Sequence, residues 1–452
     1  MSTAGEREPI AVIGAGYVGL VSAAGFAELG SEVWCVDIDA AKIERLRAGE
    51  VPIHEPGVQE LLRRNAGTLH FSTDLTGALE HARLLFVAVG TPPTYSGDAD
   101  LSAVHAVVEA IPPSEEHALV MKSTVPCGTG AALQRSFRER GKGGLGYVSC
   151  PEFLREGSAV HDFMHPDRVV VGIDEHDSWA GDAVVELYAS LGVPLVRTDI
   201  ASAEMVKLAS NAFLATKISF INEIANVCEE TGADVVEVAR GMGLDTRIGP
   251  RFLHAGIGYG GSCFPKDVDA LKQLAGNSGY HFQLLTAVIE VNELQKRRVI
   301  AKLHKHLGGL AGRRVALFGL AFKPETDDMR DASSLVLAAR LNADGARVVA
   351  YDPVAEEQAR RMVSGIEFAG SALEAAGDAD AVVLVTEWPE FQTLDWGLVA
   401  ERMRGVLVID GRNALDPDAV RAAGLTYEGV GRSAQRRAGE REPDARVPGG
   451  SR

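Results

Sequence analysis

Short apolar runs alternate with longer helix-like stretches along the first 200 residues of the chain. The runs cover residues 10–13, 32–36, 84–89, 118–122 and 147–150. Apolar runs of this length are typical of strands that are buried on both faces of a parallel sheet. The alternation predicts an α/β domain with helices packed on an open sheet.

The middle of the chain is dominated by helix-like patterns. Residues 201–230 contain no proline or glycine and predict one long helix. Its many apolar residues lead us to expect a face buried against a second subunit. Helical patterning resumes from Val268 to about Leu307. Strand-like runs then predict a second α/β unit, at residues 314–318, 347–350, 381–385 and 406–409.

A glycine motif directly follows the first predicted strand. Gly14, Gly16 and Gly19 form a G-x-G-x-x-G pattern, residues 20–29 predict a helix, and the second strand ends at Asp37. This order is typical of a dinucleotide site, because the glycines let the pyrophosphate approach the helix N-terminus. The acidic residue holds the ribose hydroxyls and favours NAD over NADP. The alternative is a glycine turn that only packs a helix on a strand.

A second glycine-rich segment, residues 256–267, carries reactive side chains. Cys263, Lys266 and Asp267 lie within five residues, behind four glycines. A thiolate becomes a usable nucleophile when nearby positive charge or a helix start lowers its pKa, and we expect Lys266 to supply that charge. Cys263 is therefore the candidate nucleophile; alternatively, it is a small buried hydrophobic residue.

Two polar residues of the predicted long helix are candidates for binding a reacting oxygen. Lys207 and Asn211 are four residues apart and therefore share one face of the helix. An ammonium and an amide donor placed in this way can stabilise an alkoxide. Leu208, Ala212 and Phe213 favour burial of this region, and two solvent-facing polar side chains are the alternative.

Further candidates follow the carboxyl ends of predicted strands, where open α/β sheets bind ligands. Thr91 and Thr124 each come after such a strand. Glu152 and Glu156 follow the strand at 147–150 and would share one face if this segment were helical. Glu152 is a candidate base, and a solvated surface cluster is the alternative.

The composition restricts the partners and the compartment. The net charge of −17 argues against nucleic acid or an anionic membrane surface as partner. Five scattered cysteines without a C-x-x-C pair predict free thiols in a reducing compartment and no metal site. No apolar signal segment or membrane-length apolar run is present. The 452 residues, 46% of them hydrophobic, are therefore expected to form two or three domains of a cytoplasmic protein.

Together these motifs resemble the nucleotide-sugar dehydrogenase family, most closely its UDP-glucose 6-dehydrogenases. The motifs that carry the resemblance are residues 14–20, 123–126 and 151–157, Lys207 with Asn211, and the loop 260–267. The resemblance implies two Rossmann-like domains joined by a long central helix and a helical dimerisation region. The implied divisions are an NAD-binding domain (1–200), a dimerisation region with the cysteine loop (201–308) and a UDP-sugar-binding domain (309–432). Charged residues with Pro, Gly and Ser predict a disordered tail, 433–452.

The resemblance implies oxidation of a hexose primary alcohol to a carboxylate, with two NAD and one water. Because it is closest to the UDP-glucose 6-dehydrogenases, UDP-glucose is the implied substrate. Cys263 would form a thiohemiacetal and then a thioester, and Glu152 would act as base directly or through Thr124 and a water. The helix donors would stabilise the oxyanion, and Asp267 would position the water with Lys207. The implied catalytic residues are thus Cys263, Lys207, Asn211, Asp267, Glu152 and Thr124.

The resemblance also assigns binding residues. The implied cofactor-binding residues are Gly14, Gly16, Tyr17, Val18, Gly19, Asp37, Lys42, Thr91, Thr124, Glu156, Lys266 and Arg330. The implied residues for the nucleotide sugar are Glu152, Phe153, Leu154, Lys207, Asn211, Arg247, Phe252, Leu253, Gly260 and Lys323. Arg247 is implied to reach into the site of a neighbouring subunit, so we expect a homodimer.

Three alternatives stay open at this point. The same chemistry could act on dTDP-glucose, GDP-mannose or a UDP-N-acetylhexosamine. A single-step hydroxyacid-type dehydrogenase shares the Rossmann start and the Lys-x-x-x-Asn helix, but has no use for a thioester-forming Cys263. A non-catalytic sugar-nucleotide sensor would not need the catalytic set. The chain also departs from the family at Cys150, where asparagine is usual; we interpret Cys150 as structural, and the change leaves the sugar or base preference open.

Overall fold

The computed structural model describes residues 7–114 and 116–432, which divide into two compact units. Unit 1 contains the described residues up to Thr216 together with Tyr259–Glu290 and Ala321–Ala332. Unit 2 contains Lys217–Gly258, Val291–Leu320 and the described residues from Ser333 onward. The tail predicted at 433–452 lies outside the described residues.

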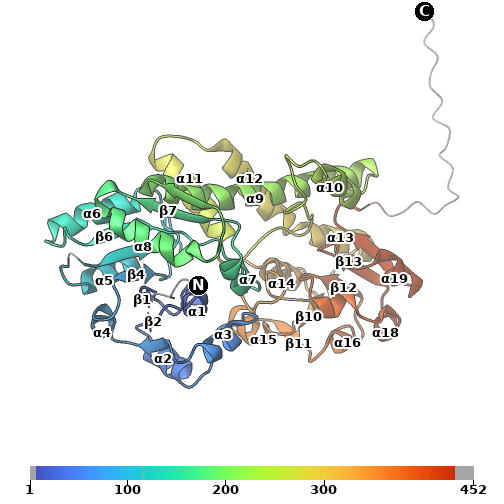
Figure 1. Cartoon of the computed structure of the whole chain (residues 1–452). Helices are drawn as coiled ribbons and strands as arrows, with labels where there is room; N and C mark the ends of the chain where they lie inside the picture. Colours follow the sequence, from blue (N-terminus) through green and yellow to red (C-terminus); the bar gives the residue numbers. More distant parts are fainter. Residues whose placement is uncertain (1–6, 115, 433–452) are drawn as a thin grey trace, which may run out of the picture. The chain divides into compact units, whose positions relative to one another are not determined.

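Unit 1 is organised around a sheet that has eight strands within the described residues, in the order β3-β2-β1-β4-β5-β6-β7-β8 (Figure 1). Neighbouring strands run parallel except for β6 and β7. In the register of the sheet, Val12 lies between Cys35 and Phe86. The strands are β1 (Ile10–Ile13), β2 (Val33–Val36), β3 (Leu69–Ser72), β4 (Leu84–Val87), β5 (Ala118–Met121), β6 (Gly146–Ser149), β7 (Val169–Ile173) and β8 (Leu195–Thr198). The order reverses between β1 and β4, so their carboxyl ends form a switch point of the kind that binds ligands.

Helices cover both faces of this sheet. Phe26 of α1, Phe163 of α7 and Tyr188 of α8 are buried on one face, and Val107 of α5 and Phe137 of α6 are buried on the other. The helices are α1 (Tyr17–Glu28), α2 (Ala40–Arg47), α3 (Val58–Arg64), α4 (Leu75–Leu79), α5 (Ser102–Ala110), α6 (Thr129–Glu139), α7 (Ala159–Met164), α8 (Ser178–Ala189) and α11 (Phe264–Asn277), with a short 3-10 helix at Glu175–Asp177. Apolar residues on alternate sides of each strand thus build two cores, as expected for a parallel sheet covered on both faces.

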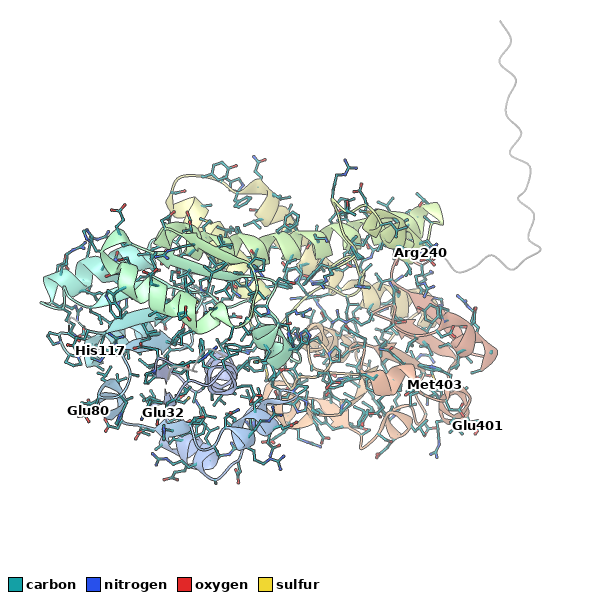
Figure 2. The ribbon with its side chains drawn as sticks, in the orientation of Figure 1. Glu32, Glu80, His117, Arg240, Glu401 and Met403 are labelled. Atoms are coloured by element: carbon teal, nitrogen blue, oxygen red, sulfur yellow. The ribbon has the colours of Figure 1, made fainter. Side chains whose placement is uncertain are left out.

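Unit 2 repeats this plan with a sheet in the order β11-β10-β9-β12-β13-β14, parallel throughout its described strands. Its strands are β9 (Arg314–Phe318), β10 (Arg347–Tyr351), β11 (Ile366–Phe368), β12 (Ala381–Leu384), β13 (Leu407–Asp410) and β14 (Thr426–Gly429). Its helices are α10 (Val235–Gly243), α13 (Arg298–Leu307), α14 (Ser333–Ala343), α15 (Glu356–Met362), α16 (Ala372–Ala375), α17 (Pro389–Gln392), α18 (Trp396–Arg402) and α19 (Pro417–Ala422). Figure 2 labels exposed Glu401 and buried Met403 at the end of α18, where the chain turns from solvent into the core.

The long helix predicted at 201–230 is α9 (Ile200–Thr231), whose first part belongs to unit 1 and whose second part belongs to unit 2. The predicted α/β class with two Rossmann-like sheets and a long central helix is therefore confirmed. The helical pattern at 268–307 corresponds to three helices, α11, α12 (Gln283–Gln295) and α13. The break between α11 and α12 falls at Gly279, which has φ 81°. None of the helices within the described residues has the length and apolar character needed to cross a membrane.

One buried carboxylate joins α9 to the loop before α6. Glu204 accepts hydrogen bonds from the backbone N–H groups of Gly128 and Gly130, both at 2.7 Å. The hydroxyl of Tyr147 donates to the same carboxylate at 3.5 Å. Since the first N–H groups of a helix have no partner within the helix, Glu204 satisfies donors that would otherwise be buried unpaired. This contact fixes the helix that carries Lys207 against the segment that follows Thr124.

Candidate active site

The glycine motif forms the turn between β1 and α1. Gly14 has φ 102°, and a Cβ there would lie 2.6 Å from the carbonyl oxygen of Ala88. A Cβ on Gly19 would lie 1.7 Å from the carbonyl oxygen of Gly14, so this glycine is required for the turn to pack. A Cβ on Gly16 would meet no atom of the described residues within 4 Å. The open space at Gly16, in front of the N-terminus of α1, fits the pyrophosphate of a dinucleotide.

Asp37 follows β2 and faces the same turn. Its carboxylate accepts from the N–H of Ala15 at 2.8 Å and from the ammonium of Lys42 at 2.9 Å. Burial alone would raise the pKa of Asp37, but hydrogen bonds from the N–H of Asp39, from Lys42 and from Ala15 outweigh burial and lower it. A fixed negative charge at this position suits the ribose hydroxyls of NAD and disfavours the phosphate of NADP. The residues present therefore fit NAD.

Asp352 follows β10 in unit 2, in the place where Asp37 follows β2. Its carboxylate already accepts from the N–H of Leu320 at 2.7 Å and from the indole of Trp388 at 3.2 Å. The N–H groups of Val354 and Ala355 bind its other oxygen. Each oxygen of Asp352 therefore accepts from two donors and the residue is only 3% exposed, whereas Oδ1 of Asp37 accepts from the N–H of Asp39 and the side chain is 11% exposed. Asp352 is thus less accessible to a ribose than Asp37. This agrees with the departure of the second glycine sequence from the first fingerprint.

Lys207 and Glu152 form a buried ion pair. The ammonium of Lys207 on α9 lies 3.0 Å from the carboxylate of Glu152, and their side chains are 4% and 7% exposed. Burial alone would lower the pKa of Lys207, but the carboxylates of Glu152 and Asp267 outweigh it and raise the pKa. Lys207 therefore stays an ammonium and can stabilise negative charge on a reacting oxygen.

Asn211 and Asp267 form a second buried pair one turn along α9. The amide of Asn211 donates to Asp267 at 2.6 Å, and the ammonium of Lys266 donates to its other oxygen at 2.6 Å. Asn211 and Asp267 are 7% and 1% exposed. The expected burial of this helix face is thus confirmed for Lys207, Asn211, Leu208 and Ala212, whereas Phe213 is 66% exposed.

Cys263 lies immediately before α11 and is partly buried. Burial and then the carboxylate of Glu152 raise the pKa of its thiol, and together they outweigh the opposing effects of Lys207 and Ser262. The prediction that Lys266 lowers this pKa is therefore wrong, because its ammonium binds Asp267 instead. The thiol is protonated at neutral pH and needs a proton acceptor when it reacts.

The segment 151–157 is a loop, so the expectation that Glu152 and Glu156 share a helical face is not met. Glu152 turns to Lys207, whereas Glu156 accepts from the hydroxyl of Ser262 at 3.0 Å. Glu55 holds the end of the loop, because its carboxylate accepts from the N–H groups of Gly157 at 2.6 Å and Ala159 at 2.8 Å. The two glutamates therefore have separate partners.

Several predicted binding residues lie around this loop in unit 1. The guanidinium of Arg168 stacks on Phe153 at 3.5 Å from the ring centroid, and the N–H of Leu154 donates to Glu152. The hydroxyl of Tyr17 binds the carboxylate of Glu55 and accepts from the N–H of Gly157 at 3.0 Å. Tyr17 thereby joins the glycine turn to the Glu152 loop.

The remaining predicted residues of unit 1 come from three further segments. Thr91 donates to the carbonyl oxygen of Thr124 at 2.8 Å, which ties two strand ends together. Gly260 is buried, and a Cβ there would lie 2.3 Å from the carbonyl oxygen of Asp331. Lys323 is partly buried, and Arg330 lies 3.6 Å from Glu156. Val18 lies in the first turn of α1.

Three predicted residues belong to unit 2. Arg247 is exposed and forms an ion pair with Asp245 at 2.6 Å. Phe252 has φ 65°, and Leu253 is 4% exposed. Their roles in binding a nucleotide sugar stay predictions.

Cys150 is fully buried at the end of β6. The ammonium of Lys122, 5% exposed, lies 3.8 Å from its sulfur and 5.4 Å from the ring centroid of Tyr188. The burial favours the structural interpretation of Cys150.

Sequence reasoning missed four residues that shape the site. Glu55 and Arg168 are far in sequence from the groups they contact, and no local pattern marks them. Ser262 precedes Cys263 directly, so its proximity was visible but its bond to Glu156 was not. Asp328 binds Arg330 at 2.8 Å, and this acidic residue lies only two positions earlier in the chain.

Comparisons with known proteins agree with this geometry. Three models of the UDP-glucose/GDP-mannose dehydrogenase family match: the NAD binding domain at residues 8–192, the central domain at 201–294 and the UDP binding domain at 316–417. The chain belongs to this family. NAD is therefore its cofactor, and a nucleotide sugar is its class of substrate.

Individual relatives of this dehydrogenase cover nearly its whole length. The UDP-glucose 6-dehydrogenase TuaD of Bacillus subtilis (strain 168) is 45% identical over 97% of this chain and 96% of its own. The UDP-glucose 6-dehydrogenase of Rhizobium meliloti (strain 1021) is 46% identical over 94% of this chain and 99% of its own. The solved UDP-glucose dehydrogenase of Pyrobaculum islandicum is 39% identical, with a TM-score of 0.88 over 96% of this chain and 99% of its own.

The two glycines of the turn are expected to respond differently to alanine. Gly19→Ala should lower the free energy of unfolding by roughly 1–3 kcal/mol, because the methyl would meet Gly14 at 1.7 Å. Gly16→Ala should stay within about 1 kcal/mol of wild-type stability. It should nevertheless bind NAD at least about tenfold more weakly, since the methyl fills the pyrophosphate space. Urea unfolding and calorimetric NAD titration measure the two effects. Unchanged NAD affinity in Gly16→Ala would contradict this site.

The raised pKa of Cys263 predicts slow alkylation at neutral pH. Only the thiolate reacts with iodoacetamide, so the rate at Cys263 should rise about tenfold per pH unit from pH 7 towards pH 9, without a plateau. Peptide mass spectrometry of the ligand-free protein follows this cysteine separately from Cys127. A rate that is already maximal at pH 7 would show instead that the thiol is activated before substrate binds.

Proposed function

We propose that this dehydrogenase oxidises UDP-glucose to UDP-glucuronate in two NAD-dependent steps, through a thioester on Cys263. The observation that carries the proposal is the position of Cys263 at the start of α11, in the electrostatic field of Lys207, Glu152 and Asp267. Three relatives at 45–46% identity, including the one from Pseudomonas aeruginosa, bear the name UDP-glucose 6-dehydrogenase. The position of Cys263 favours a four-electron oxidation over release of an aldehyde, and the names of the relatives favour UDP-glucose as the substrate.

The residues divide the chemistry between them. Lys207 and Asn211 hold the oxygen on the reacting carbon, and their positive charge and dipole stabilise it as an alkoxide. NAD, when bound, supplies the hydride acceptor for both oxidations. Cys263 adds to the aldehyde carbon and keeps the sugar attached until the second oxidation gives a thioester. Glu152, directly or through Thr124 and a water, removes a proton from the water that hydrolyses this thioester.

Asp267 has a positioning role in this scheme. Its two oxygens accept from Asn211 and Lys266, so it fixes the direction of the amide donor. We also assign it the positioning of the hydrolytic water, together with Lys207. The set Gly14, Gly16, Tyr17, Val18, Gly19, Asp37, Lys42, Thr91, Thr124, Glu156, Lys266 and Arg330 is proposed to bind NAD.

Among the nucleotide sugars, UDP-glucose is the substrate that we propose. A solved UDP-D-ManNAc dehydrogenase from Pyrococcus horikoshii is 28% identical with a TM-score of 0.81, so relatives with other substrates share the architecture. The higher identity to UDP-glucose dehydrogenases favours UDP-glucose. Arg247, Phe252, Leu253, Gly260, Lys323, Phe153 and Leu154 are proposed to contact the nucleotide sugar.

We further infer a homodimer, with α9 at its interface. Met205, Phe213, Phe220 and Val227 are 36–66% exposed and follow one another at intervals of eight, seven and seven residues. Residues seven apart lie on nearly the same side of a helix, so these side chains form an apolar stripe. An apolar stripe of this kind favours a protein partner. The cytoplasmic location stays a prediction.

The stoichiometry of NADH tests the reaction. Wild-type protein should form two NADH per UDP-glucose. It should form less NADH when dTDP-glucose, GDP-mannose or UDP-N-acetylglucosamine replaces UDP-glucose. Cys263→Ala should lower steady-state turnover by at least about 10³-fold, because the nucleophile is lost. Cys127→Ala is the matched control and should keep the wild-type rate. One NADH with free aldehyde, or full activity of Cys263→Ala, would support a single-step dehydrogenase; no NADH with any donor would support a sensor.

The oligomeric state tests the α9 stripe. Light scattering should give wild-type protein a mass of twice the 48.0 kDa of the chain. Phe213→Glu with Phe220→Glu should give monomers, because two charges would be buried unpaired in the interface. Leu398→Glu, at another exposed apolar residue, is the control and should leave the dimer intact. A monomeric wild-type protein would contradict the homodimer.

A further inference from the structure

Ser262 connects the sulfur of Cys263 to a second carboxylate. Its hydroxyl donates to Glu156 at 3.0 Å, and its oxygen lies 3.5 Å from the sulfur of Cys263. Since the Ser262 proton points to Glu156, a lone pair of the same oxygen can accept from the thiol. The three groups thus form a continuous path for a proton.

Glu156 is the carboxylate in this region with unused capacity to accept. Its side chain is 10% exposed, and among the described residues its Oε2 atom has no hydrogen-bond partner. Arg330 lies 3.6 Å from the other oxygen, and Lys323 and Asp328 also act on it electrostatically. Burial, followed by Asp328, raises the pKa of Glu156 to about 7, despite the opposing effects of Arg330, Lys323 and Ser262. A group with this pKa takes and returns a proton readily at neutral pH.

The other two carboxylates are occupied. Glu152 accepts from Lys207 at 3.0 Å and from the N–H of Leu154. Asp267 accepts from Asn211 and Lys266 through its two oxygens. Both carboxylates raise the pKa of the Cys263 thiol and so disfavour its thiolate form. The hydroxyl of Ser262, which approaches the sulfur, donates to Glu156 instead of to either of them.

We propose that Glu156 acts through Ser262 as the base that deprotonates Cys263 when the thiol adds to the aldehyde. This proposal rests on the proposed function. As the carbon–sulfur bond forms, the thiol proton passes to the Ser262 oxygen and the Ser262 proton passes to Glu156. The carbonyl π bond becomes an alkoxide held by Lys207 and Asn211.

The same path runs backwards at the end of the cycle. When water hydrolyses the thioester, the carbon–sulfur bond breaks and the sulfur leaves as a thiolate. Glu156 returns its proton through Ser262 to this sulfur, so the relay undergoes no net change. The first oxidation, of alcohol to aldehyde, does not use the relay. Glu156 and Ser262 therefore serve a different proton from the one that Glu152 removes from water.

Separating the two oxidations tests the relay. In single-turnover stopped-flow measurements at saturating NAD, Ser262→Ala should form the first NADH from UDP-glucose at the wild-type rate. It should oxidise the UDP-linked 6-aldehyde about 10²-fold more slowly, because general base catalysis is lost. Glu156→Gln should also slow the oxidation of the aldehyde, and because Glu156 is also proposed to bind NAD, its rate is measured at NAD concentrations that saturate this variant. Ser262→Thr keeps a hydroxyl and should restore most of the second rate.

The pH dependence supplies a readout that a purely structural role would not change. With the aldehyde as substrate, the wild-type rate should fall on the acid side of about pH 7, because Glu156 becomes protonated and cannot accept. Ser262→Ala and Glu156→Gln should lose this acid limb. Ser190→Ala and Glu186→Gln, both exposed on α8 or at its end, are the controls and should keep it.

Three results would overturn the relay. Oxidation of the aldehyde by Ser262→Ala at the wild-type rate would exclude Ser262 from the path. Equal slowing of both oxidations would show a general effect on the site. An unchanged acid limb in Glu156→Gln would assign the titration to another group. Absence of NADH from wild-type protein with every donor would overturn the proposed function together with the relay, and is thereby distinguished from the first three.

Discussion

The ammonium of Lys207 is buried, and the neighbouring groups are arranged to compensate for its lost hydration. Removing one partner of a buried ion pair costs roughly 3–5 kcal/mol, because the remaining charge stays unpaired in a poor solvent for ions. Glu152, 3.0 Å away, is therefore bound to α9, and the loop that carries it must follow the helix. The same burial strengthens the electric field of Lys207, since little water screens it. In the proposed mechanism that field acts on the reacting oxygen, so stability and the proposed chemistry depend on one interaction.

The sequence predicted those parts of the molecule that depend on local rules. Apolar runs marked strands of both sheets, the absence of glycine and proline marked α9, and the glycine spacing marked the β1–α1 turn. It could not predict partners that approach from distant segments, such as Glu55 at the Glu152 loop. The condition that 151–157 be helical is not met, because side chains from other segments, such as Glu55 and Tyr17, bind a backbone N–H group at the end of this loop. The pKa of Cys263 depends on burial, which no short pattern encodes.

The two sheets share a strand order but differ in the turn that follows their first strand. The first six strands of unit 1 and the strands of unit 2 follow the same spatial order. In unit 1 the turn after β1 leaves open space at Gly16. In unit 2, Gly319 directly follows β9 with φ 91° and corresponds to Gly14, because a Cβ at either glycine would lie within 2.6 Å of the end of the neighbouring strand's segment, at Thr386 or Ala88. The first glycine of the turn is preserved in both, but Ala321 stands where the first turn has Gly16, so the glycine motif is not repeated and a shared topology does not imply a shared ligand.

The bonds of Glu204 to Gly128 and Gly130 have a mechanical consequence. Because the carboxylate bridges α9 and the start of α6 through two short bonds, a shift of either element strains the other. Lys207 is one turn further along α9, and Thr124 lies just before the bridged loop. We therefore expect thermal motion to change the separation of Lys207 and Thr124 less than it would if each were carried by an independent element.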